Sequence, residues 1–170
     1  MASVGELMGN VKESVRTCGG LFELTEKRNV LSSAFAGILF AIGWWCIIDV
    51  AVTNPAEGEF HHAYHVVGVV STIAFIMINM VSNGQIRGEG FSDGFLGQRG
   101  ARIWLFLGFL LGFSALIAAT WILFQTYVVG SGPGPVPNND KWPGVGLFLQ
   151  NLFIFLAALV YKFGRTDEMM

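Results

Sequence analysis

Four long stretches of this sequence carry almost no charge: residues 30–52, 66–82, 103–129 and 145–161. Each approaches or exceeds the roughly 20 residues that a helix needs to cross about 30 Å of hydrocarbon. Only 13% of the residues are charged and 53% are hydrophobic, whereas soluble domains carry about 25% charged residues. The sequence therefore predicts an all-α polytopic membrane protein, a bundle of four transmembrane helices.

The Lys and Arg residues are divided unequally among the segments that join these stretches. Nine of the ten lie in the N-terminal segment, the segment between the second and third stretches, and the C-terminal tail. The other two connecting segments hold only Lys141. Because Lys and Arg are retained on the cytoplasmic side during insertion, this pattern predicts that both termini and the middle loop are cytosolic.

The domain organisation follows from the lengths of the four apolar stretches. The four stretches leave too few residues for a separate soluble domain, so we expect one membrane domain at 30–161. A cytosolic segment at 1–29 and a cytosolic tail at 162–170 would flank it. We predict no enzymatic activity, no cofactor and no nucleic-acid partner. The expected partners are membrane lipids and another integral-membrane or membrane-anchored protein.

The N-terminal segment has apolar residues at helical spacing: Val4, Leu7, Met8, Val11 and Val15. This spacing fits an amphipathic helix that lies on the cytosolic leaflet. It also fits a solvated terminus, because Gly5 and Gly9 weaken a helix. The run Cys18-Gly19-Gly20 is expected to break the pattern.

The loop at 83–102 combines six glycines with three arginines. Its glycine pattern matches neither a P-loop nor a dinucleotide fingerprint. Arginines at the cytosolic border suit contacts with anionic lipid headgroups, and they also enforce topology. The lipid-headgroup candidates are Arg87, Arg99 and Arg102.

Histidines gather between the first two stretches, at His61, His62 and His65. His61 and His65 are four residues apart and would share a face of a helix, as metal ligands can. A metal site needs three or four converging ligands, and only Glu57, Glu59 and distant acids could complete one. The three histidines are thus weak metal candidates. A pH-sensitive cluster and ordinary membrane-edge histidines are the alternatives.

Asp49 is the acidic residue within the first apolar stretch. A carboxylate inside a membrane should reach water or find a partner. His65 has the same predicted depth, so we expect a contact from Asp49 to His65 or to the backbone that locks the first two helices together. A proton or ion relay through Asp49 is the alternative.

Other residues in the stretches suit helix packing. Gly108 and Gly112 form a G-x-x-x-G pair that permits close helix contact, and Asn79, Gln150 and Asn151 could donate hydrogen bonds between helices. Trp44 and Trp45 are expected near a membrane boundary and are candidates for structural or partner contacts.

Several longer strings resemble the transmembrane protein 50 family. They include Ala36-Gly-Ile-Leu-Phe-Ala-Ile-Gly-Trp-Trp, His62-Ala-Tyr-His65, Gly100-Ala-Arg-Ile-Trp-Leu-Phe and Tyr161-Lys-Phe-Gly-Arg-Thr166. The resemblance is collinear from about Lys27 to Glu168. The chain departs from the family pattern in its longer N-terminal lead and in the Gly- and Pro-rich segment at 130–141.

The resemblance implies a small four-span protein of the endomembrane system, in endosomes, lysosomes or the endoplasmic reticulum. Fungal members are associated with endosome-to-vacuole sorting as a subunit of a membrane complex. The family has no catalytic residues to carry over. The leading hypothesis is therefore a non-enzymatic accessory or scaffold subunit in protein trafficking. The alternatives are a lipid-handling subunit of a lipid-transfer complex and a small ion or proton transporter that uses Asp49.

Overall fold

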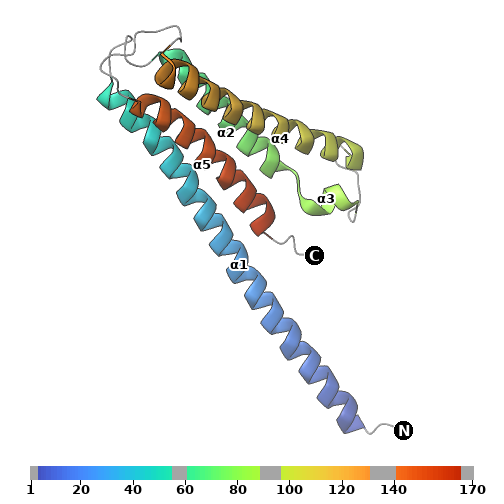
Figure 1. Cartoon of the computed structure of the whole chain (residues 1–170). Helices are drawn as coiled ribbons and strands as arrows, with labels where there is room; N and C mark the ends of the chain where they lie inside the picture. The colour runs from blue at the N-terminus through green and yellow to red at the C-terminus, as the bar shows by residue number, and fades with distance from the viewer. Residues whose placement is uncertain (1–3, 55–60, 89–96, 131–140, 166–170) are drawn as a thin grey trace.

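The computed structural model describes residues 4–54, 61–88, 97–130 and 141–165, with side chains from residue 26 onward except that of His62. Every secondary-structure element in these residues is helical. Figure 1 shows the helices gathered along a shared length, with one helix extending far beyond the others. The predicted helical membrane bundle is confirmed.

Among the described residues, three helices are long and apolar enough to cross a membrane. Helix α1 (Val4–Thr53) contains the apolar stretch Glu26–Thr53, and α5 (Trp142–Gly164) is predominantly apolar. Helix α4 (Gly97–Ile122) continues into the π-helical segment η2 (Leu123–Val128), so the third span reaches from Gly97 to Val128. The fourth apolar helix, α2 (His65–Met80), has only 16 residues.

Two short elements connect the long helices. The 3-10 turn η1 (His62–Tyr64) leads into α2. Helix α3 (Asn83–Arg87) is preceded by its N-cap residue, Ser82. The Ser82 hydroxyl accepts a hydrogen bond from the backbone N–H of Gln85, and the Gln85 side-chain oxygen accepts one from the backbone N–H of Ser82. This reciprocal cap satisfies two backbone donors at the start of α3. Gly88, at φ +78°, ends the helix in the left-handed conformation.

Helix α5 is the centre of the bundle and contacts α1, α2 and α4. Half of the residues in its apolar stretch are buried, against 22% in those of α1 and α4. Lipid-facing helices leave large apolar side chains exposed, and α1 and α4 do so. The order of contacts along each pair of helices makes α5 antiparallel to α1 and α4 and parallel to α2.

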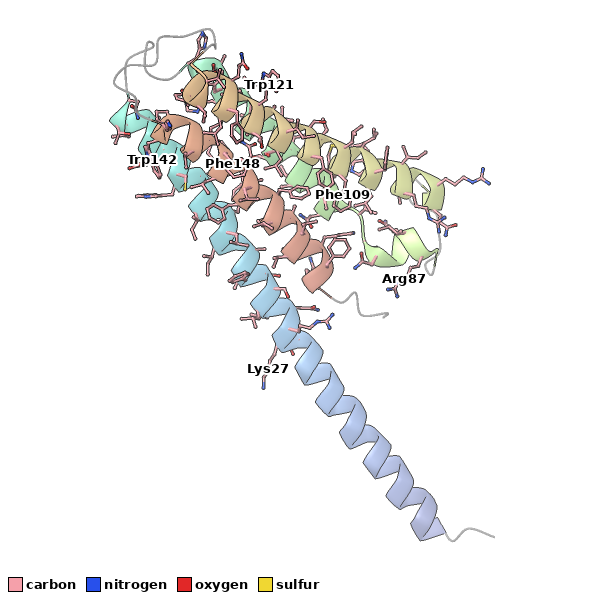
Figure 2. The ribbon with its side chains drawn as sticks, viewed as in Figure 1. Lys27, Arg87, Phe109, Trp121, Trp142 and Phe148 are labelled. Carbon is pink, nitrogen blue, oxygen red and sulfur yellow. The ribbon has the colours of Figure 1, made fainter. Side chains whose placement is uncertain are left out.

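The two ends of the bundle differ in charge. One end, which we call the basic end, carries Lys27, Arg28, Arg87, Arg99, Arg102, Lys162 and Arg165. The opposite end, which we call the Trp142 end, carries Asp49, His61, His65, Lys141 and Trp142. Figure 2 shows Lys27 and Arg87 toward the first end and Trp121 and Trp142 toward the second.

Helix α1 is continuous through Cys18-Gly19-Gly20, so the predicted break at these residues is wrong. The N-terminal segment is not a separate helix but part of α1, and its predicted place on the cytosolic leaflet stays a prediction. It extends α1 in the direction of the span and leaves the bundle past the end of α5 (Figure 1). The apolar pattern of Val4 to Val15 concerns side chains outside the described part of the chain.

Candidate functional site

Small residues allow the helices to approach one another closely. A Cβ added at Gly43 of α1 would lie 3.0 Å from the backbone oxygen of Gln150 in α5 and 3.3 Å from Ile154 Cγ1. Gly146 of α5 lies against Val50 of α1, and Gly164 against Ser32. These glycines bring the backbones of α1 and α5 into contact along the whole shared length.

The G-x-x-x-G pair of α4 lies in two different helix contacts. A Cβ at Gly108 would lie 3.2 Å from the backbone nitrogen of Ile78 in α2, and one at Gly112 would lie 3.0 Å from the Phe155 ring of α5. The pair therefore positions α4 against both α2 and α5.

Asp49 pairs with Trp142. The indole Nε1 of Trp142 donates to Asp49 Oδ2 across 2.9 Å. The carboxylate therefore ties α1 to α5. A contact of Asp49 with His65 or with the backbone stays a prediction. Asp49 is exposed at the end of the bundle, a position that gives no support to an ion path through the interior.

The π-helical segment η2 places two consecutive residues, Thr126 and Tyr127, in the interior. A π-turn adds a residue to the helical repeat and so rotates the side chains that follow it. The Thr126 hydroxyl lies 3.4 Å from the Tyr64 hydroxyl, and the Tyr127 ring lies against Gly144 of α5. These contacts close the Trp142 end between η2, η1 and α5.

The two neighbouring tryptophans of α1 have different environments. Trp44 packs against the core cluster that contains Ile47 and Leu147. Trp45 is 72% exposed. Trp44 therefore packs inside the bundle, whereas Trp45 lies on its outer surface.

The described histidines do not form a metal centre. Among the side chains that the structure describes, no group of three or more from His, Cys, Asp or Glu could hold a metal ion. The Nδ1 atom of His61 accepts from the backbone of Ala63 at 3.4 Å, and its ring packs near Tyr64. The side chain of His62, together with Glu57 and Glu59, lies outside the described residues.

The buried Lys162 was not singled out by sequence reasoning. Its side chain is 6% exposed, and Nζ donates to the carbonyl oxygen of Val81, the C-cap of α2. A cation at this position satisfies an orphan carbonyl and interacts favourably with the helix dipole. The signal in the sequence is its spacing, because Ile154, Ala158 and Lys162 are each four residues apart on the buried face of α5.

The three arginines proposed as headgroup ligands are all exposed at the basic end. Arg102 also has an internal role, since its Nε donates to the carbonyl oxygen of Ile86 across 3.1 Å. The Gln98 amide donates to the carbonyl oxygen of Arg87 across 3.2 Å. These bonds cap the last carbonyls of α3 and attach it to α4. Headgroup binding by Arg87, Arg99 and Arg102 stays a prediction.

The amide side chains of Asn79, Gln150 and Asn151 do not form the predicted hydrogen bonds between helices. Asn79 and Asn151 each donate to a carbonyl of their own helix, those of Phe75 and Leu147, at 2.8 Å. Gln150 is fully buried, and neither its Nε2 nor its Oε1 has a hydrogen-bond partner within the described part. Its amide lies against Gly68 of α2, where an added Cβ would be 2.6 Å from Gln150 Cδ.

Replacing this amide with an apolar side chain of similar length should not destabilise the bundle. An unpaired buried amide costs about 1–3 kcal/mol, so Gln150→Met is expected to leave the unfolding temperature unchanged or to raise it. Thermal unfolding in mild detergent measures the effect. A fall of several degrees would instead show that the amide makes a hydrogen bond in the folded protein.

Comparison with known proteins agrees with this architecture. The family described as "Uncharacterised protein family (UPF0220)" matches residues 12–169. A protein of Dictyostelium discoideum, named transmembrane protein 50 homolog, is 32% identical over 148 residues, which cover 79% of this chain and 90% of that protein. No solved structure matches this chain.

Proposed function

This chain belongs to the transmembrane protein 50 family (UPF0220), and we propose that it is a non-enzymatic accessory subunit of a larger membrane-protein complex. The observation that carries the proposal is the length of α1. Toward the N-terminus, α1 meets α5 at Ser32. From Ser32 back to Val4, the helix extends about 40 Å at 1.5 Å per residue, and Figure 1 shows no other helix beside its N-terminal part.

A helix of this composition needs support from another surface. It contains Gly5, Gly9, Gly19 and Gly20, and each glycine in a helix costs about 1 kcal/mol relative to alanine. Most helical stability in proteins comes from packing of a face and not from intrinsic propensity. The projecting part of α1 is therefore suited to pack against a helix of another subunit.

The direction of the projecting helix favours binding to a protein rather than to the surface of the bilayer. An amphipathic helix that binds lipid lies in the plane of the interface. The N-terminal part of α1 instead continues the direction of its own transmembrane part. A helix that leaves the membrane in this way can reach a subunit beyond the headgroup region.

The basic end supports the proposed topology. Seven Lys and Arg residues of the described part lie there, and α1 projects from this end. By the positive-inside rule, this end faces the cytosol, together with both termini. The transmembrane protein 50 resemblance favours endosomal, lysosomal or endoplasmic-reticulum membranes and a role in protein trafficking.

Removing residues 1–25 tests the subunit proposal. The full chain and the truncated chain would each be tagged at the C-terminus and purified from native membranes in mild detergent. We expect the truncated chain to lose most of the copurifying partner, measured by quantitative mass spectrometry, and to keep the unfolding temperature of the full bundle.

A variant that strengthens the same helix is the control for this truncation. Gly5→Ala with Gly9→Ala raises helix propensity and should retain the partner. Full recovery of the partner by the truncated chain would contradict the proposed role of the projecting helix.

A further inference from the structure

The apolar surface that α2 offers to lipid is short. Its exposed large apolar side chains are Val66, Val69, Ile73, Ile76 and Met80. From Val66 to Met80 the helix rises about 21 Å at 1.5 Å per residue. The hydrocarbon layer of a typical bilayer is about 30 Å thick, so this face falls short of a typical bilayer by roughly 9 Å.

The other lipid-facing helices are longer. The exposed apolar side chains of α1 run from Val30 to Val52, about 33 Å along the helix. Those of α4 run from Ile103 to Trp121, about 27 Å at 1.5 Å per residue, and the π-helical segment η2 continues this face to Val128. The exposed apolar surface of the bundle is therefore longer along α1 and α4 than along α2.

Polar groups fix both ends of the short face. At the basic end, the ammonium of Lys162 bonds to Val81, and Ser82 caps α3 directly after it. At the Trp142 end, the Tyr64 hydroxyl lies near the Thr126 hydroxyl, immediately before α2. Because these groups belong in or near the headgroup region, α2 cannot gain apolar length by sliding along its neighbours.

Tilting cannot remove the mismatch on this side. A helix longer than the hydrocarbon layer can tilt until its apolar length fits. A helix that is too short only loses height when it tilts, so it is accommodated by local thinning of the bilayer, by snorkelling of flanking side chains or by oligomerisation. The polar groups at both ends of α2 are already bonded within the bundle, which favours thinning. The shortest helix therefore sets the bilayer thickness that the bundle prefers.

We propose that the α2 face (Val66, Val69, Ile73, Ile76 and Met80) is a lipid-contact surface that selects thin bilayers and draws the two leaflets together beside it. The ligand is a phospholipid with short acyl chains. This inference goes beyond the proposed subunit role and stands without it, because it depends only on the lengths of the helices.

Reconstitution of the purified full chain into phosphatidylcholine vesicles tests the proposal. The vesicles would contain myristoleoyl, oleoyl or erucoyl chains, which form progressively thicker bilayers. The unfolding temperature should be highest with myristoleoyl chains and should fall with each increase in chain length. A maximum in oleoyl or erucoyl vesicles would overturn the proposal.

Two matched substitutions at the basic end assign the effect to α2. Met80→Ser shortens the already short face of α2 and should make the fall with chain length steeper. Ile103→Ser shortens the long face of α4, which has apolar length to spare, and should leave the chain-length dependence unchanged. Identical responses of the two variants would contradict an origin at α2.

Discussion

Gly43→Leu should separate α1 from the rest of the bundle and cause a large loss of stability. The glycine lies against the Gln150 backbone, where an added Cβ already approaches within 3.0 Å. A backbone atom cannot move aside as a side chain can, so the helices themselves must part. Overpacking in a core costs about 3 kcal/mol at the upper end of its common range, and thermal unfolding in detergent measures the loss.

Gly37→Leu provides the matched control on the same helix. An added Cβ at Gly37 would have nothing within 4 Å, so a leucine there should face lipid at little cost. Equal effects of Gly37→Leu and Gly43→Leu would show that α1 and α5 do not approach closely at Gly43.

The second large effect is expected from Lys162→Met. This substitution removes the buried ammonium and leaves the Val81 carbonyl oxygen without its donor. An unsatisfied buried carbonyl costs about 1–3 kcal/mol, and α2 also loses a cation at its C-terminus. We expect a lower unfolding temperature in detergent, because the end of α2 is no longer attached to α5.

Arg165→Met is the control for Lys162→Met. It removes an exposed positive charge at the same end of α5, so it separates the effect of losing a buried cation from the effect of losing a charge. Arg165 is exposed, donates to the Tyr161 hydroxyl across 2.7 Å and lies over the Tyr161 ring. Exposed interactions of this kind are worth less than about 1 kcal/mol, so its loss should be small. A loss as large as that of Lys162→Met would argue against the proposed cap.

Within the described residues, three of the four predicted spans match helices long enough to cross a membrane, and the fourth matches the shorter apolar helix α2. The long helices could be predicted because the bilayer fixes their length. Residues 145–161 lie within α5, whereas the helix predicted at 103–129 starts six residues earlier, at Gly97, and ends at Val128. The predicted stretch 66–82 ends two residues beyond Met80. Ser82 caps α3, and this local hydrogen bonding stops the apolar helix earlier than hydropathy does.

The break at Cys18-Gly19-Gly20 failed as a prediction because it treated glycine as a stop. A glycine costs about 1 kcal/mol in a helix interior, whereas propagation from an existing helix avoids the cost of nucleation. The transmembrane part of α1 supplies that nucleus, so the helix continues through both glycines to Val4.

The pairings at the two ends of the bundle depend on tertiary structure. Asp49 and Trp142 are 93 residues apart, and Lys162 and Val81 are 81 apart. A shared predicted depth suggested His65 as a partner of Asp49, but depth alone could not identify Trp142 of α5 as a partner. The central position of α5 decides both pairings, and it became visible only in the assembled bundle.

The mass of the full chain in its native assembly tests the central claim most directly. The protein would be extracted from native membranes in mild detergent and measured by native mass spectrometry after removal of the detergent. The proposed subunit role predicts a particle in which this chain is bound in fixed proportion to a different membrane protein. A particle that contains only this chain and lipid would contradict that role.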